Sequence, residues 1–367
     1  MGDHTDYNDG LCLPMAIQLG CTVTATPMVP QHTDYNDGFV LPLAIDRACT
    51  IRVGPPSANG AIHATSHQLA GHVNIPVDGS GAPSTVEPAW GRFVAGVVRA
   101  LGDRGIAVAP ADLDVDTTVP VGSGLSSSSA LAVALTLGLG GDRLDRVDAA
   151  RAASAAETAA SGVPGGLMDQ LASLFGQAAH ALLIDCRAVT VTPVAIPASI
   201  AVLVVHCGVP RALAATEYAD RRAQCEAVAA GLGIPALRDA TAEQVRDSPR
   251  ARHVVAENAR VLETADALPR GDLSVLGPLL LASHASLRDD FGVSTLELDT
   301  LVDVLVTSGA AGARLTGAGF GGCVVALAQR NHADDVLAKT TLRYRDATGL
   351  EPMAFVARAV DGAHVLD

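Results

Sequence analysis

Lysine is nearly absent from this chain: Lys339 is the only one among 367 residues, and arginine supplies the other basic side chains. Aromatic residues make up only 3% of the chain, so alanine, valine and leucine supply most of its apolar content. With 25 basic against 39 acidic side chains, the net charge is −14. Nucleic acids select for basic surfaces, so we expect no nucleic-acid partner. A phosphorylated ligand stays possible, because oriented backbone N–H groups can hold phosphate.

Long hydrophobic runs and paired cysteines are also missing. No apolar run reaches the roughly 20 residues that a membrane-spanning helix needs, and the first residues lack the basic start of a signal peptide. The seven cysteines are odd in number and scattered, and no two of them form a CxxC pair. This pattern favours free thiols in a reducing compartment. We therefore expect a cytoplasmic protein without a membrane partner.

The chain is long enough for two domains of the usual size, roughly 100–200 residues each. Apolar periodicity predicts strands at 49–53, 61–66, 113–119, 181–185, 189–194, 200–206, 313–316, 323–328 and 353–359. It predicts helices at 90–101, 130–139, 145–160, 216–231, 254–267, 271–284, 296–308 and 333–348. Because strands and helices do not alternate regularly, we predict an α+β fold with domains at 1–195 and 196–367.

One seven-residue sequence occurs twice. Residues 4–10 read HTDYNDG and recur unchanged at 32–38, a shift of 28 (32 − 4), and Leu13-Pro14 recurs as Leu41-Pro42 at the same shift. Two copies are too few for a solenoid, which favours a local duplication or a disturbed reading frame.

The second copy concentrates hydrogen-bond donors and acceptors between His32 and Asp37. A sugar presents several hydroxyls and needs such a cluster. An ordinary Asn/Asp turn is the alternative interpretation, because Asn36-Asp37-Gly38 has the sequence of one. We call residues 32–38 the sugar loop, since only this copy has the following hairpin attached. The fallback in the first copy is Asp3, His4 and Asp6.

A Gly/Ser segment, PVGSGLSSSSA at residues 120–130, is the strongest local feature. A strand ends there, glycines permit a tight turn, and a helix begins at serines that suit its N-cap. The unsatisfied N–H groups of that first turn form an anion site, and serine hydroxyls can reach a phosphate or Mg²⁺. The segment is not a Walker loop, because no Gly-Lys-Ser/Thr follows. A flexible linker is the alternative, but a strongly apolar helix follows at once.

Three further positions carry weaker indications. The loop at 316–322 lies between two apolar strands and contains four glycines, which indicates a close approach of backbone or ligand or a tight hairpin. Asp169, after a Gly/Pro turn, can orient or deprotonate a hydroxyl. Glu157, on an alanine-rich helix, can bind Mg²⁺ through a hard oxygen. Taken singly, each acid fits an ordinary surface residue equally well.

Together these segments resemble the galactokinases of the GHMP kinase superfamily. The likeness runs from about residue 30 to the C-terminus and implies a two-domain GHMP kinase architecture, with the active site in the cleft between the domains. The segments that carry it are 32–38 with Leu41-Pro42, 120–130, 166–170, Glu217-Tyr218 with Arg221-Arg222 and Cys225-Glu226, 283–291, and 315–323.

The resemblance implies that ATP phosphorylates galactose at its anomeric hydroxyl, giving galactose 1-phosphate, with Asp169 as catalytic carboxylate and Mg²⁺ held by Ser128 and Glu157. The ATP site would comprise Pro120, Gly122, Ser123, Gly124, Leu125, Ser126, Ser127 and Ser128, with Trp90 and Phe93 near the adenine. The sugar would contact His32, Asp34, Gly166, Asp169 and Tyr218. The third-motif loop, with Gly317, Gly319, Gly321 and Gly322, would support the site from the second domain. We expect the protein to work as a monomer.

The N-terminal region departs from the family pattern. Family members carry an arginine, in an Ala-Pro-Gly-Arg-type segment, that stabilises the transferring phosphoryl group; Thr26 stands at its expected position and Gln31 replaces a glutamate. Residues 21–27 could still form the usual edge strand. Losing such an arginine costs on the order of 10³–10⁵ in rate, so we predict strongly reduced turnover unless another cation substitutes. The alternatives are a catalytically weak galactose- and ATP-binding sensor, and a GHMP kinase for another sugar.

Overall fold

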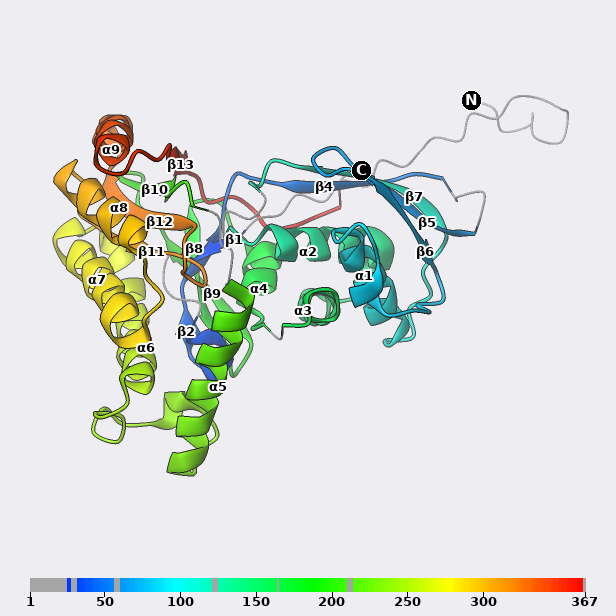
Figure 1. Ribbon diagram of the computed structural model, residues 1–367, viewed down its shortest axis with the longest axis horizontal. Helices are drawn as coiled ribbons and strands as arrows, with labels where there is room; N and C mark the ends of the chain where they lie inside the picture. Colours follow the sequence, from blue (N-terminus) through cyan, green and yellow to red (C-terminus); the bar gives the residue numbers. More distant parts are fainter. Residues whose placement is uncertain are drawn as a thin grey trace, which may run out of the picture.

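The computed structural model describes residues 25–27, 32–55, 60–120, 125–163, 165–209 and 214–365, with only the backbone described in 25–27 and 214–216. The molecule is elongated, and its two ends are built from different sheets and helices (Figure 1). Short strands and one short helix lie between these ends. The expected site residues come from this middle region and from the parts of the two ends that face it.

The N-terminal end is a mixed four-stranded sheet in the order β4-β7-β5-β6, in which only β5 and β7 run parallel. Its strands are β4 (Cys49–Val53), β5 (Ala61–Ser66), β6 (His72–Pro76) and β7 (Ala111–Thr117). The helices α1 (Gly91–Gly102), α2 (Ser127–Gly140) and α3 (Arg146–Ser161) cover one face (Figure 1). Because helices cover only one face, buried and exposed residues alternate along β6, where Val73 and Ile75 are buried between exposed neighbours.

The middle of the molecule holds two small antiparallel sheets and a short helix. One sheet pairs β1 (Ala25–Pro27) with β3 (Pro42–Ala44), and the other orders β2 (Phe39–Val40), β8 (His180–Asp185) and β9 (Thr190–Ala195) as β2-β8-β9. The helix α4 (Met168–Phe175) follows the turn that contains Gly166. The sugar loop, with a 3₁₀ turn η1 (Asp34–Asn36), leads directly into β2.

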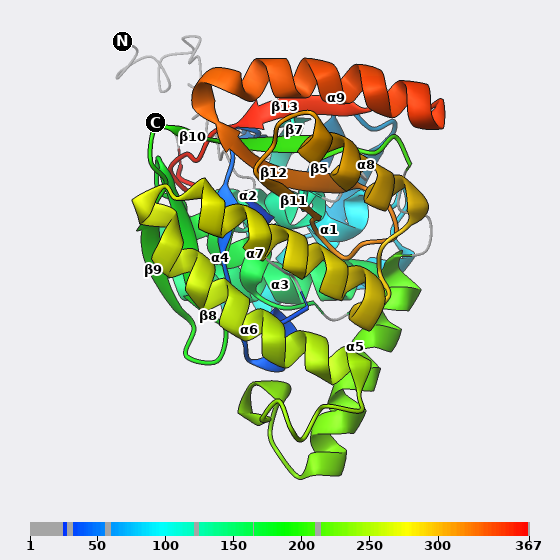
Figure 2. The ribbon, with the colours of Figure 1, turned by 90° about the vertical axis from the view of Figure 1, so that its left-hand side faces the viewer.

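The C-terminal end is an antiparallel sheet in the order β11-β12-β10-β13. Its strands are β10 (Ile200–His206), β11 (Gly312–Leu315), β12 (Cys323–Gln329) and β13 (Met353–Ala357). The helices are α5 (Ala214–Leu232), α6 (Pro249–Ala267), α7 (Leu273–Ser286), α8 (Leu296–Thr307) and α9 (Ala333–Thr348) (Figure 2).

The unbroken apolar run of β10 is explained by two hydrophobic clusters. Val202 and Val204 face the cluster that also contains the core of the N-terminal end. Leu203 and Val205 face the second cluster, which includes buried residues of α8 and α9. A strand buried on both faces needs no polar alternation, so the prediction of a buried strand at 200–206 is confirmed.

Most predicted elements are confirmed, and the strands at 49–53, 61–66 and 200–206 and the helix at 333–348 agree at both ends. The α+β class is confirmed as well. The prediction missed β6, the short strands β2 and β3, and α4. The edge strand expected at 21–27 is present in its described part, where Thr26 pairs with Leu43.

The predicted domain boundary at 195/196 falls at the end of β9, just before β10. Val194 and Ile200, on opposite sides of it, belong to one hydrophobic cluster. The boundary therefore separates elements that share a core, and its placement stays a prediction. None of the helices in the described part of the chain is long and apolar enough to cross a membrane.

Candidate active site

The sugar loop is held in shape by its own backbone. The carbonyl oxygen of Thr33 accepts hydrogen bonds from the N–H groups of Asn36 (3.1 Å) and Gly38 (2.8 Å). The Asn36 side chain donates to the carbonyl oxygen of His32 at 2.8 Å, and Asp37 adopts a left-handed backbone with φ of 58°. The loop is thus an Asn/Asp turn in conformation, as the alternative interpretation expected, and it also places Asp34 beside two other expected site residues.

Asp34 lies against the turn before α4. A Cβ atom added at Gly166 would lie 2.0 Å from Oδ2 of Asp34, so only glycine fits there. Burial raises the pKa of Asp34 to about 8, and the negative charge of Asp169 adds to this shift. The structure therefore brings Asp34, Gly166 and Asp169 together from two segments more than a hundred residues apart.

His32 belongs to a cluster of aromatic side chains. The ring centroid of His32 lies 4.4 Å from that of Phe291 and 5.8 Å from that of Tyr218. The Nδ1 atom of His32 lies 3.0 Å from the hydroxyl of Tyr35, whose ring meets Tyr218 edge-on. Two of the chain's four tyrosines gather here. Burial, with the charge of Asp34 second, raises the pKa of Tyr218 well above its usual value, so its hydroxyl keeps its proton.

Glu157 and Ser128, the expected metal ligands, are in direct contact. The Glu157 carboxylate accepts hydrogen bonds from Ser128 (2.5 Å), Ser129 (2.7 Å) and the amide of Gln170 (2.7 Å). Burial raises the pKa of Glu157, and these three hydrogen bonds act in the opposite direction. Gln170 is the residue after Asp169 in the first turn of α4. Through it, the metal-ligand pair and the expected catalytic carboxylate belong to one connected group.

A pocket of about 270 Å³ lies beside this group. Trp90, Phe93, Leu69 and Leu131 provide apolar walls, and Ser127 and Ser128 line it too. The indole N–H of Trp90 is satisfied by the carbonyl oxygen of Ala70 at 3.3 Å. The pocket thus joins a flat aromatic and apolar wall to the N-terminal turn of α2, where an adenine and its phosphates would need to meet.

The Gly/Ser loop is described only in part. Gly122, Ser123 and Gly124 lie outside the described residues, as do Gln31 and the first-copy residues Asp3, His4 and Asp6. Pro120 is the last described residue before this gap. After the gap, Leu125 is fully buried and Ser126 has a left-handed backbone with φ of 55°. Ser127 begins α2, which agrees with a helix starting at the serines.

The third-motif loop contacts the chain just after Phe291 of the aromatic cluster. Gly317, Gly319, Gly321 and Gly322 all have positive φ. A Cβ atom at Gly319 would lie 2.3 Å from the carbonyl oxygen of Val293, so the close backbone approach expected for this loop is present. The Phe320 N–H donates to the same oxygen at 2.8 Å. Since Val293 is two residues beyond Phe291, the loop supports the segment that contacts His32.

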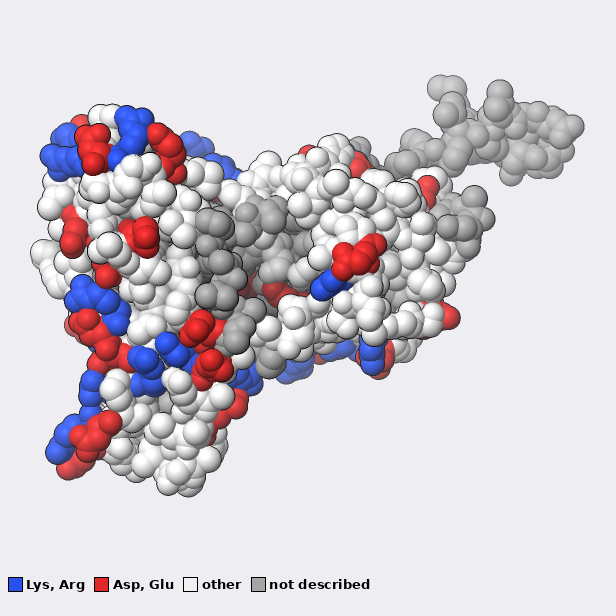
Figure 3. Space-filling view, in the orientation of Figure 1, with Lys and Arg blue, Asp and Glu red and all other residues white. Residues whose placement is uncertain are grey.

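Three residues of the site were not predicted. Phe291, Ser129 and Gln170 contact His32 or Glu157. Phe291 and Gln170 lie inside segments of the family resemblance, but no local pattern marks them. Ser129 was detectable only as a member of the serine run. Figure 3 shows that the molecule is hollowed between its two ends, with acidic side chains visible inside the hollow.

Comparisons with known families match both ends of the chain. The model of the GHMP kinases N terminal domain matches residues 92–177, and that of the GHMP kinases C terminal matches residues 264–345. The galactokinase galactose-binding signature matches residues 1–27 and again 31–55. The signature therefore covers both copies of the repeat.

Comparisons with individual proteins extend over nearly the whole chain. Galactokinase of Haemophilus influenzae is 39% identical over 386 aligned positions, covering 100% of this chain and 92% of the relative. Galactokinase of Mycobacterium tuberculosis is 41% identical over 380 positions, covering 99% and 95%. The structure of Lactococcus lactis galactokinase complexed with galactose is similar, with a TM-score of 0.87 at 27% identity over 95% of both chains.

These comparisons confirm the expected GHMP kinase fold, because the two family domains account for the two ends seen in Figure 1. They also confirm the narrower resemblance, because the relatives named above are galactokinases aligned over more than nine-tenths of their length. The chain belongs to the galactokinase family of GHMP kinases.

Proposed function

We propose that the protein transfers the γ-phosphoryl group of ATP to the anomeric hydroxyl of D-galactose, giving galactose 1-phosphate. One observation carries the proposal: Asp34, Asp169 and the Ser128–Glu157 pair, from four separate segments, meet in one connected group. The similar Lactococcus lactis structure was solved with galactose. Because all these residues come from one chain, we propose that a monomer suffices.

Asp169 is the group that faces the reacting hydroxyl in this proposal. Phosphoryl transfer depends mainly on positioning and charge stabilisation, so its carboxylate orients the hydroxyl and accepts its proton. His32, Asp34 and Tyr218 bind the other sugar hydroxyls, with Gly166 leaving room for Asp34. Burial of Tyr218 keeps its hydroxyl protonated and able to donate.

ATP is proposed to lie between the Trp90 pocket and the first turn of α2. The apolar walls suit a purine ring, and the free N–H groups at the start of a helix suit phosphates. Ser128 and Glu157 supply a hydroxyl and a carboxylate oxygen, hard donors that suit Mg²⁺ when phosphates complete its coordination. When bound, the ion would neutralise phosphate charge.

The N-terminal departure favours slow turnover. Thr26, at the position where the family has its phosphoryl-stabilising arginine, lies in β1, which pairs with β3 in one of the two small sheets in the middle of the molecule. Among the described residues, Arg222 is a cation whose charge acts on Asp34, yet its Nε also donates to Glu226 at 2.8 Å. We therefore keep the proposal of reduced turnover. A galactose- and ATP-binding sensor is the second candidate function, and the threonine at position 26 supports it as well.

An ADP-release assay with a panel of sugars tests the proposal, and calorimetry of galactose binding accompanies it. We expect phosphorylation of galactose in preference to other sugars, at a rate below the usual kinase range of roughly 1–100 s⁻¹. Galactose binding without any turnover would identify the sensor instead. Preference for a different sugar would replace the substrate and leave the kinase assignment intact.

A further inference from the structure

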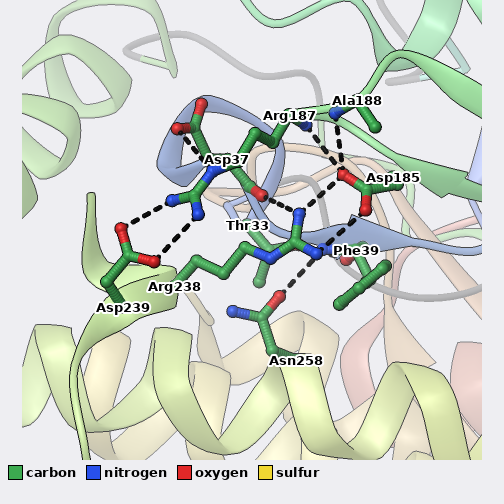
Figure 4. Close-up of polar contacts among 9 residues, drawn as sticks. All are labelled: Thr33, Asp37, Phe39, Asp185, Arg187, Ala188, Arg238, Asp239 and Asn258. Carbon is green, nitrogen blue, oxygen red and sulfur yellow. Dashed lines mark hydrogen bonds and ion pairs between the residues drawn. The ribbon is translucent and has the colours of Figure 1, made fainter. Parts of the chain in front are cut away.

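A charged network attaches the outer side of the sugar loop to three other segments (Figure 4). Arg238, in the 3₁₀ turn η4 (Leu237–Asp239), donates to both carboxylate oxygens of Asp185 at 2.6 and 2.9 Å. The same guanidinium donates to the carbonyl oxygen of Asp37 at 2.9 Å and lies 4.1 Å from the centre of the Phe39 ring. One side chain therefore ties the end of β8 to the end of the sugar loop.

A second arginine repeats the connection nearer the surface. Arg187 donates to both carboxylate oxygens of Asp239 at 2.8 and 2.6 Å, and through Nε to Asp37 at 3.2 Å. The side chain of Asn258, on α6, accepts a hydrogen bond from the Phe39 N–H at 2.8 Å. Figure 4 shows these contacts converging on residues 37–39, where the loop becomes β2.

The two arginines are not equivalent. The side chains of Arg238 and Asp185 are 21% and 20% exposed, whereas those of Arg187 and Asp37 are 39% and 45% exposed. Exposed ion pairs contribute little because water and salt screen them. A bidentate arginine–carboxylate contact that is less exposed to water is stronger, and it fixes the relative orientation of the two side chains. Arg238 is therefore the principal anchor and Arg187 the weaker one.

The packing of Asp34 shows why the position of the loop matters. Asp34 is buried close to Asp169 and lies 2.0 Å from where a Gly166 side chain would begin, so its surroundings depend closely on where the loop sits against α4. Asp37, three residues further on, is where both arginines attach. The network therefore fixes the position of the same short turn that carries Asp34.

We propose that Arg238, assisted by Arg187, is a positioning residue that holds the sugar loop against α4 and so determines affinity for the sugar without touching it. This inference rests on the proposed function, because it assumes that the loop binds galactose. A purely structural role predicts something different: lower thermal stability with unchanged sugar affinity in the protein that remains folded.

The test compares R238M with R143M. Arg143 is a matched control: it donates to the carbonyl oxygens of Gly140, Ala107 and Leu139 at 2.7–2.8 Å and belongs to the N-terminal end. For R238M we expect the galactose KM and the calorimetric Kd to rise about tenfold or more, with the KM for ATP changed less than about twofold. For R143M we expect a lower Tm and an unchanged galactose KM.

Two milder variants keep the test decisive should R238M fail to fold. R238K retains a charge near Asp185 but loses the fork that reaches Asp37, so we expect it to recover only part of the lost affinity. R187M should raise the galactose KM by about two- to threefold. An unchanged galactose KM in folded R238M, or in both R238K and R187M, overturns the proposal, as does an equal increase in R143M. Wild-type protein that neither binds nor phosphorylates galactose would instead overturn the proposed function.

Discussion

Two carboxylates in the site differ in how their charge is accommodated. Glu157 accepts hydrogen bonds from Ser128, Ser129 and Gln170, which partly offset the effect of burial on its pKa. Asp34 accepts one from the N–H of Tyr35 at 2.8 Å, but Asp169 adds to the effect of burial, and its pKa reaches about 8. The carboxylate on the proposed nucleotide side is thus held by three hydrogen bonds, whereas the proposed sugar side places Asp34 close to a second acid, Asp169.

This difference suggests where each half of the site gains its binding energy. A cation at Glu157 would find an oxygen already oriented by three donors. Asp34 favours its protonated form in the free protein, and the hydroxyl donors of a sugar would stabilise its ionised form, so galactose binding should lower the pKa of Asp34. We expect substitutions on the two sides to have effects that differ in both their size and their pH dependence.

Asp169→Asn tests the repulsion and the chemistry together. The amide can no longer accept the proton of the hydroxyl, so we expect kcat in the ADP-release assay to fall by about 10²–10⁴-fold. The calorimetric Kd for galactose should change little or improve, because Asp34 loses its charged neighbour. Asp148→Asn, an exposed acid at the start of α3, is the matched control. Unchanged turnover in Asp169→Asn would contradict the catalytic assignment.

Asp34→Asn separates stability from affinity. Between the ordinary value of 3.8 and about 8, folded protein keeps a proton on Asp34 that unfolded protein releases. Rising pH in that window therefore lowers the free energy of unfolding, and the loss is complete above about 8. The amide carries no such penalty, so the Tm advantage of the variant should grow between pH 5 and 8 and then level off. Tm curves that stay parallel would show that the pKa of Asp34 is not raised in the folded protein.

The same variant should bind galactose more weakly. Removing a charged hydrogen-bond acceptor costs about 1.5–3 kcal/mol, which corresponds to roughly 10–100-fold in Kd. Because more of wild-type Asp34 is ionised as the pH rises through about 8, calorimetry on the alkaline side should show the largest difference. If galactose affinity is unaffected while the Tm rises, burial of Asp34 destabilises the fold without contributing to sugar binding.

The overall fold was largely predictable because apolar periodicity marks long elements. The run at 200–206 and the helix at 333–348 could be placed from their own residues. The strand β2 was missed because two residues carry too little pattern, and α4 was missed because eight residues make only about two helical turns. The approach of Asp34 to Asp169 depends on tertiary packing and is visible in the sequence only through the family resemblance. Arg238 lies in an irregular turn, where no periodicity points to its partners.

Glu157→Gln tests the nucleotide side of the comparison. The amide keeps the size of the side chain but removes the charge that a cation needs, while Ser128 and Ser129 can still donate to its oxygen. We expect the Mg²⁺ concentration for half-maximal ADP release to rise about tenfold, with galactose Kd unchanged. A galactose effect as large as the Mg²⁺ effect would show that the two sides are not separate. Asp148→Asn again serves as the control.

Leu69→Ala should have the smallest effect, because it alters only an apolar wall. Leu69 is 37% exposed and lines the pocket beside Trp90, so truncating it removes part of a contact surface without unpairing any polar group. Losing one or two buried methylene contacts costs about 1 kcal/mol, or roughly three- to fivefold in the KM for ATP. Leu342→Ala, at a more exposed leucine on α9 (54%), is the control. Because the wall carries no charge, the effect should be constant between pH 6 and 9, unlike that of Asp34→Asn. A pH-dependent ATP effect would mean that charge matters on both sides of the site, and the contrast between them would fail.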